Sequence, residues 1–135
     1  MAQHILLVED EADLRLGLSV RLSASGFHCE TACNGKEGLE EVARHRPDLI
    51  IADLLMPVMD GFEMVHRLKA SPQTSAIPIL IITALPERSR APRADELRGI
   101  RILQKPFEAR ELLVTVRALL APPQSSSPDR ISRDG

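Results

Sequence analysis

Asp48-Leu-Ile-Ile-Ala-Asp53, followed directly by Leu54-Leu-Met-Pro-Val-Met-Asp60-Gly61, predicts a central strand and places one carboxylate at its end. The four apolar residues 49–52 are typical of a strand that is buried on both faces of a sheet. An ionised carboxylate set against apolar residues carries a large desolvation penalty unless a cation or hydrogen-bond donors compensate it. We therefore expect a cation or hydrogen-bond donors next to Asp53.

Three other strand-like segments also end on groups that can do chemistry. The run 5–8 closes on two adjacent acids, the run 79–82 on a hydroxyl, and the run 100–104 on an amine. The carboxyl ends of parallel strands share one edge of a sheet. We therefore expect five side chains to converge there: Glu9, Asp10, Asp53, Thr83 and Lys105.

The rest of the chain alternates strand-like and helix-like segments. Apolar spacing and breaker residues predict helices at 13–25, 36–46, 61–70 and 108–120, and a further strand at 27–32. Five strands alternating with five helices imply an α/β fold with a doubly wound parallel sheet and helices on both faces.

Two segments carry more detailed expectations. In the helix expected at 13–25, an apolar stripe of Leu14, Leu18 and Leu22 is widened by Leu16 and Val20. The segment 85–99 contains two prolines and few apolar residues, so only a short helix is expected there, beginning near Pro92.

Length and composition indicate one compact domain over residues 1–121. Residues 122–135 lack the apolar content to pack and are predicted to be a disordered tail. A net charge of -2 without a basic run argues against nucleic-acid binding, and no apolar stretch is long enough for membrane insertion. Cys29 and Cys33 are expected to be reduced thiols, as in a cytoplasmic protein.

The four histidines, at positions 4, 28, 45 and 66, are scattered along the chain without metal-ligand spacing. No chemistry is expected of them.

The acids at the shared edge predict a metal site. Glu9, Asp10 and Asp53 would repel one another, and a hard divalent cation with oxygen ligands relieves that repulsion, which favours Mg²⁺. A carboxylate beside Mg²⁺ is suited to attack phosphorus and form an acyl phosphate. Asp53 is then the nucleophile, Lys105 neutralises phosphoryl charge and Thr83 donates a hydrogen bond to a phosphoryl oxygen.

These motifs resemble the receiver domain of bacterial two-component response regulators, over roughly residues 4 to 120. The resemblance rests on Val8-Glu9-Asp10-Glu11, Asp53-Leu-Leu-Met56-Pro57-Val-Met-Asp60-Gly61, Thr83-Ala84 and Lys105-Pro106-Phe107. Each of these motifs is weak alone, but here four follow in the family's order, each at a strand end.

The resemblance implies a flavodoxin-like sheet of order 2-1-3-4-5. It also implies phosphotransfer from a histidine kinase or histidine phosphotransfer protein to Asp53. Mg²⁺ would be held by Glu9 or Asp10, by Asp53 and by the backbone carbonyl of Leu55, and the Lys105-Pro106 bond would be cis. The protein would be a stand-alone signalling domain that catalyses only its own phosphorylation and dephosphorylation, and its phosphorylated form would bind a separate target protein.

One departure from the family pattern concerns the switch. The family usually has Tyr or Phe three residues before the motif lysine, where this chain has Ile102. Aromatic switching in its usual form is therefore excluded, and a receiver-like interaction module that signals without phosphorylation is the alternative function. The apolar Leu55 and Leu85, which by family position flank the phosphate, suggest slow self-dephosphorylation.

Plainer interpretations apply to several single residues. Asp10 or Asp13 could cap the following helix, Met56 and Met59 could pack the loop, and the arginines of 88–101 could form a solvated face or bind an acidic partner.

Overall fold

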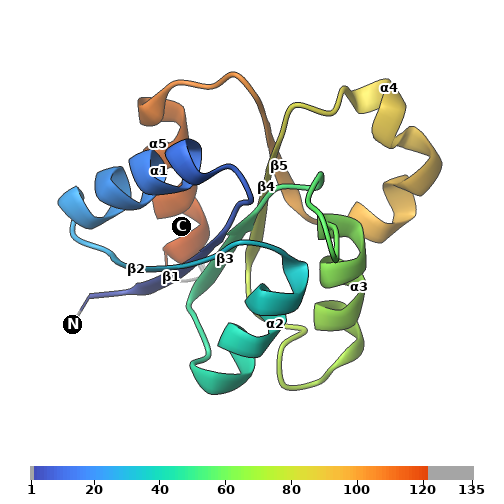
Figure 1. Ribbon diagram of the computed structural model, residues 1–135, viewed down its shortest axis with the longest axis horizontal. Coiled ribbons are helices and arrows are strands. Elements are labelled where there is room, and N and C mark those ends of the chain that lie inside the picture. Colours follow the sequence, from blue (N-terminus) through green and yellow to red (C-terminus); the bar gives the residue numbers. More distant parts are fainter. Residues whose placement is uncertain (1, 122–135) are drawn as a thin grey trace, which may run out of the picture.

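The computed structural model describes residues 2–121 and shows a three-layer α/β architecture (Figure 1). The predicted tail at 122–135 lies outside the described residues. The elements, in chain order, are β1 (His4–Val8), α1 (Ala12–Ala24), β2 (His28–Ala32), α2 (Gly35–Arg44), β3 (Leu49–Ala52), α3 (Gly61–Ala70), β4 (Ile79–Thr83), α4 (Glu87–Arg90), the 3₁₀ helix η1 (Ala91–Leu97), β5 (Arg101–Gln104) and α5 (Ala109–Leu120).

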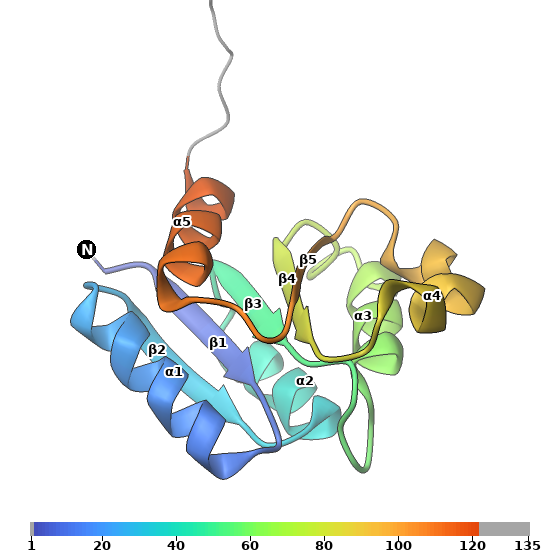
Figure 2. The same cartoon turned by 90° about the horizontal axis from the view of Figure 1, so that it is seen from above.

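The five strands form one parallel sheet in the order β2-β1-β3-β4-β5, which confirms the predicted fold class. Helices α1 and α5 cover one face of the sheet, and α2 and α3 cover the other (Figures 1 and 2). Because all connections between neighbouring parallel strands cross over, every strand ends at the same edge. The predicted site residues follow β1, β3, β4 and β5 at that edge.

Two apolar cores lie on the two faces of the sheet. Alternate residues of each central strand point to opposite faces, so that Leu6 of β1 packs toward α2 and α3 while Leu7 packs toward α1 and α5. All four residues of β3 are buried, because both faces of this central strand are covered. The burial of both faces explains why residues 49–52 are all apolar.

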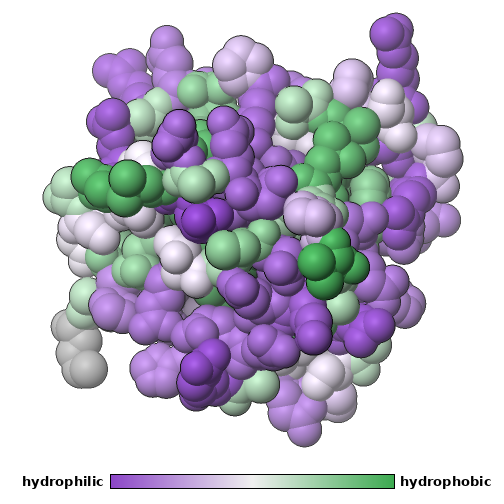
Figure 3. Space-filling view, in the orientation of Figure 1, coloured by the Kyte–Doolittle hydropathy of each residue, from purple (hydrophilic) through white to green (hydrophobic). Residues whose placement is uncertain are grey.

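The apolar stripe of α1 is narrower than the sequence predicted. Leu18 and Leu22 are buried, but Leu16 and Val20 are 64% and 59% exposed. Leu16 lies two positions from Leu18, which is about 200° around a helix, so it points away from the sheet. The predicted widening of the stripe was therefore wrong, and apolar side chains lie on the outer surface over α1 (Figure 3).

Local capping explains where two of the other helices begin. The Asn34 side chain accepts a hydrogen bond from the Glu37 N–H at the start of α2. Asp60 accepts one from the Glu63 N–H at the start of α3, at 2.9 Å. Such caps stabilise a helix by about 1 kcal/mol each. In α3 the cap also ties the helix to the loop that follows Asp53.

Among residues 2–121, no helix combines the length and the apolar character needed to cross a bilayer.

Candidate functional site

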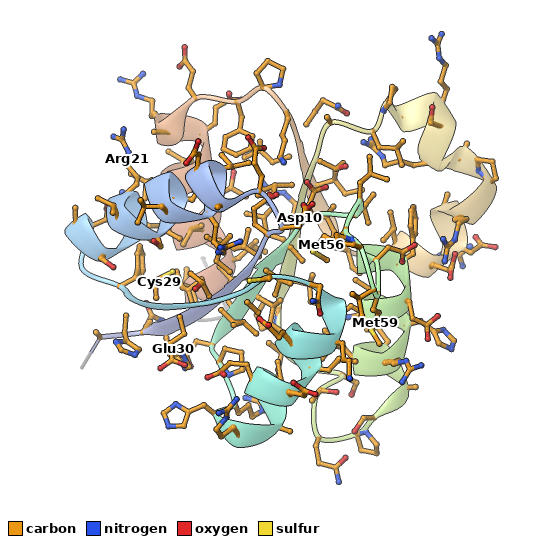
Figure 4. The ribbon with its side chains drawn as sticks, in the orientation of Figure 1. Asp10, Arg21, Cys29, Glu30, Met56 and Met59 are labelled. Atoms are coloured by element: carbon orange, nitrogen blue, oxygen red, sulfur yellow. The ribbon has the colours of Figure 1, made fainter. Side chains whose placement is uncertain are left out.

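The carboxylates of Glu9, Asp10 and Asp53 come together at the carboxyl edge of the sheet. Glu9 directly follows β1 and Asp53 directly follows β3, its neighbour, and the Asp53 N–H donates to the Val8 carbonyl at 3.2 Å. One carboxylate oxygen of each of the three residues lies within 4.8 Å of the other two. Asp10 is exposed at the rim of this edge (Figure 4), whereas Glu9 and Asp53 are buried.

The ammonium group of Lys105 reaches this cluster from the end of β5. Its Nζ donates to Asp53 Oδ2 at 2.7 Å and to Glu9 Oε1 at 3.2 Å. The peptide bond between Lys105 and Pro106 is cis, as the family resemblance implies. The compensating group that the sequence predicted for Asp53 is therefore Lys105.

The buried charges shift two pKa values in this cluster. Burial raises the pKa of Glu9 above its usual value, and the nearby negative charge of Asp53 adds to this effect. Burial alone would lower the pKa of Lys105, but its bonds to Asp53 and its attraction to Glu9 outweigh that effect and raise it. Lys105 therefore stays charged at neutral pH and holds two carboxylates together.

Thr83 is fully buried at the end of β4, between the strands that position Asp53 and Lys105. Its hydroxyl oxygen accepts a hydrogen bond from the Leu85 N–H at 3.1 Å, and its carbonyl accepts one from the Lys105 N–H at 2.7 Å. Among the described residues, no hydrogen bond joins the Thr83 hydroxyl to Asp53. The hydroxyl is thus held on the loop that leads to α4.

The loop after Asp53 packs tightly against it. The Leu55 N–H donates to Asp53 Oδ1 at 3.2 Å. A Cβ atom on Gly61 would collide with the Asp53 carbonyl and the Leu54 backbone, so only glycine fits there.

The middle of this loop differs in its packing and its backbone. Met56 and Met59 pack against the core, as expected. Val58 has a φ of 69°, an unfavourable conformation for a β-branched residue.

The charges of the cluster fit a divalent cation. When Glu9, Asp10 and Asp53 are all ionised they carry three negative charges, of which Lys105 neutralises one. A hard divalent ion with oxygen ligands would neutralise the other two. The donor set is all carboxylate oxygen at this point, which suits Mg²⁺ better than a soft transition metal.

Helix capping is not the role of Asp10 or Asp13. Glu11 occupies the N-cap position of α1 and makes no side-chain capping bond. Arg15 binds this turn instead, because its guanidinium donates to the carbonyl of Glu9 at 2.8 Å and more weakly to that of Asp10. Nothing in the sequence distinguishes Arg15, because arginines are common in helices that pack against a sheet.

The segment between β4 and β5 differs from the prediction. A helical turn, α4, already begins at Glu87, and the chain then continues as η1 from Ala91 to Leu97. Pro92 has no N–H and crowds the preceding turn, so the α-helix cannot continue through it. The chain kinks at Arg93, with φ -119° and ψ 23°. The helix expected near Pro92 is thus the second, 3₁₀ part of this segment.

Ile102 lies half-buried in β5 beneath this segment. A pocket of about 240 Å³ adjoins it, lined also by Leu97 and by residues of α4 and η1. This pocket lies on the surface that family resemblance assigns to output.

Several arginines of this segment have partners within the molecule. Arg90 donates to the Leu85 carbonyl and to Gln104, and Arg98 pairs with Asp95. Arg93 binds Glu96 at 2.6 Å and lies over the Phe62 ring, 4.0 Å from its centre. These contacts favour the plainer interpretation of an intramolecular and solvated face over a site for an acidic partner.

Three of the four histidines that are scattered along the sequence lie together in the structure. His4 lies 5.2 Å from His28 and 5.5 Å from His45, measured between ring centres. The sequence carries no signal for this cluster, because strand pairing and the end of α2 bring the three rings together.

Known proteins resemble this chain in sequence and structure. The family model described as the response regulator receiver domain matches residues 5–117. Response regulator MprA of Mycobacterium leprae is 39% identical over 117 residues, which are 87% of this chain and 50% of MprA. The chain spans about half the length of the first curated relatives it matches.

Two solved structures share the fold. Chemotaxis protein CheY4 of Vibrio cholerae superposes with a TM-score of 0.81 and 32% identity, over 89% of this chain and 100% of CheY4. The receiver domain of sensor histidine kinase PA1611 from Pseudomonas aeruginosa has a TM-score of 0.81 and 26% identity, over 89% and 98% of the two chains. That structure is described with a magnesium ion coordinated in its active site cleft.

Proposed function

The chain belongs to the response regulator receiver domain family, and we propose that it accepts a phosphoryl group on Asp53 in a Mg²⁺-dependent reaction. Phosphorylation then controls its binding to another protein. The observation that carries this proposal is the buried Asp53, which Lys105 holds at 2.7 Å beside the carboxylates of Glu9 and Asp10. A buried carboxylate with a fixed cation and an adjacent acidic cluster is costly to maintain without a use.

In the proposed reaction, an Asp53 oxygen attacks the phosphorus of a phosphohistidine. The new P–O bond forms as the P–N bond breaks, and the imidazole nitrogen leaves with the electron pair and takes a proton from water. Lys105 offsets the charge on the phosphoryl group, and the Thr83 hydroxyl, released from the Leu85 N–H, donates to a phosphoryl oxygen.

Mg²⁺, when bound, would supply positive charge to the phosphoryl oxygens. Glu9, Asp10, Asp53 and the backbone carbonyl of Leu55 are its proposed ligands. The N–H of Leu55 already contacts the Asp53 carboxylate, so this residue is held next to the acid.

The proposed donor is a histidine kinase or a histidine phosphotransfer protein, which docks beside α1. A groove of about 640 Å³ between α1 and the segment after β5 is lined mainly by apolar residues, together with the charged Asp13, Arg21 and Lys105. This arrangement would bring a donor histidine to the side of the site where Lys105 lies.

The proposed output face comprises α4, η1, β5 and α5, and a separate target protein binds there. Thr83 connects the site to this face, because its hydroxyl holds the first residues of the loop to α4. As a signalling protein, the chain would catalyse only its own phosphorylation and dephosphorylation. A cytoplasmic location stays a prediction from the sequence.

Intact-mass measurement after incubation with acetyl phosphate and Mg²⁺ tests the proposal. We expect one phosphoryl adduct on the wild type, and none with Asp53→Asn or with EDTA. Asp95→Asn is the matched control, because Asp95 is an exposed aspartate of η1 whose side chain pairs with Arg98 just after that helix, and it should be phosphorylated like the wild type.

An adduct on Asp53→Asn would refute the choice of nucleophile. If the folded wild type acquired no adduct from acetyl phosphate or from a histidine phosphodonor, the module that signals without phosphorylation would replace this proposal.

A further inference from the structure

A second cluster of metal-ligating side chains lies at the opposite edge of the sheet. His4 begins β1 and His28 begins β2, and the two residues are direct neighbours in the register of these parallel strands. Glu30 follows two residues after His28 and therefore points to the same face. One ligand atom of each of these three residues lies within 4.8 Å of the other two.

The distances between the ligand atoms of this cluster are close to those between neighbouring ligands of one metal ion. His28 Nε2 lies 3.3 Å from one Glu30 oxygen, and His4 Nε2 lies 3.8 Å from the other. Zinc bonds of about 2.0–2.2 Å to nitrogen and oxygen in tetrahedral geometry separate neighbouring ligand atoms by about 3.4 Å. Small side-chain adjustments would bring all three groups onto one ion.

His4 Nε2 provides a separate observation that points to a ligand. This nitrogen is buried, and no group of the described residues forms a hydrogen bond with it. A buried polar atom without a partner is destabilising, because it has lost its hydrogen bonds to water and gained none in the protein. The 3.8 Å separation from Glu30 is too long for a hydrogen bond, so a pairing with that carboxylate does not satisfy the nitrogen.

We propose that His4, His28 and Glu30 form a binding site for a divalent transition-metal ion of the Zn²⁺ class. Two imidazoles and one carboxylate are a typical set of three protein ligands for zinc, with a water in the fourth position. An ion bound there would join the first residues of β1 to the edge strand β2.

The surroundings of the cluster support the proposal. The His4 N–H donates to Asp48 Oδ2 at 2.7 Å, which fixes the backbone of this ligand. The carboxyl of Glu41 in α2 lies next to Glu30, and Arg44 in turn binds Glu41. Acidic groups next to a metal ligand orient it and strengthen its bond to the metal. His45 completes the ring cluster beside His4.

This site is distinct from the acidic cluster at Asp53. His4 and Glu9 lie at opposite ends of β1, roughly 15 Å apart for a five-residue strand. Glu30 and Asp10 accordingly lie far apart in Figure 4. The ligand chemistry also differs, because imidazole nitrogen prefers Zn²⁺ whereas carboxylate oxygen alone suits Mg²⁺.

Calorimetric titration of the full chain with Zn²⁺, in buffer saturated with Mg²⁺, tests this proposal. The variants are His28→Ala and Glu30→Gln, with His66→Ala as the matched control on the surface of α3, outside the cluster. Asp53→Asn and Cys33→Ser report on binding at the acidic cluster and at the exposed thiol. The side chain of His28 is 59% exposed, so its removal should leave the fold intact, which circular dichroism checks.

We expect one Zn²⁺ per chain in the wild type and in the His66, Asp53 and Cys33 variants. Affinity should fall at least about tenfold in His28→Ala and in Glu30→Gln. Zn²⁺ should also shift the imidazole NMR signals of His4 and His28 but not that of His66. Unchanged affinity in both ligand variants, loss of binding only in Asp53→Asn or Cys33→Ser, or no binding by the wild type would overturn the proposal.

Discussion

Replacing Lys105 by methionine should destabilise the protein, because two buried carboxylates then lose the cation that they share. Lys105 is the cation that contacts both Glu9 and Asp53, whose side chains are 1% and 8% exposed. Methionine keeps most of the apolar stem, so the substitution removes mainly the charge and its two hydrogen bonds. It leaves two buried acids to repel each other.

Breaking a buried ion pair by removing one partner costs about 3–5 kcal/mol. That is a large share of the roughly 5–15 kcal/mol that stabilises a domain of this size. The loss should depend on pH, because Lys105 is one of the groups that lower the pKa of Glu9. Without Lys105 that pKa rises further above its unfolded value near 4.5. A carboxyl with a raised folded pKa contributes stability below its unfolded pKa and loses it as pH rises.

The variant should therefore be closer to the wild type at pH 5 than at pH 8. Urea unfolding followed by far-ultraviolet circular dichroism measures this, since the chain has no Trp or Tyr for fluorescence. The Asp53→Asn background should reduce the loss, and Mg²⁺ should recover part of it. A loss below about 1 kcal/mol that is the same at both pH values, and additive with Asp53→Asn, would refute the reasoning.

Three further changes test the loop, the α3 cap and the output face. Val58→Asn should raise the free energy of unfolding by about 1 kcal/mol, because asparagine tolerates the φ of 69° that valine does not, and an unchanged urea midpoint would contradict this. Asp60→Ala should lower stability by about 1 kcal/mol through loss of the bond to the Glu63 N–H, whereas Asp95→Ala should have a smaller effect. Ile102→Tyr, beside the pocket under η1, should leave the phosphoryl adduct intact but change the affinity for the target. Equal target binding by this variant and the wild type would count against a switching role for Ile102.

The side chains at the strand ends were predicted to converge from local sequence patterns. Apolar runs broken by an acid, a hydroxyl or an amine are local patterns, and parallel pairing brings their ends to one edge. The convergence of Glu9, Asp10, Asp53 and Lys105 therefore followed from the sequence. The position of the Thr83 hydroxyl did not, because its rotamer depends on the Leu85 N–H in a loop without regular spacing.

Two predictions about helices were incomplete or wrong. Leu16 and Val20 lie two positions from Leu18, about 200° around the helix, so the spacing already separated them from the buried stripe that they were predicted to widen. Pro92 correctly indicated an interruption of the helix. The helical turn α4 before it was not predicted, because it depends on contacts such as that between Arg90 and the Leu85 carbonyl.

By itself, the sequence determined the order of strands and helices, the class of fold and which charged side chains meet at the carboxyl edge, since these depend on local periodicity and on the parallel sheet it implies. The tertiary structure decided which distant residues meet elsewhere. His4, His28 and Glu30 lie up to 26 positions apart, and only the pairing of β1 with β2 makes them neighbours. The contact of Arg93 with Phe62 has the same origin, because it depends on how η1 packs against α3.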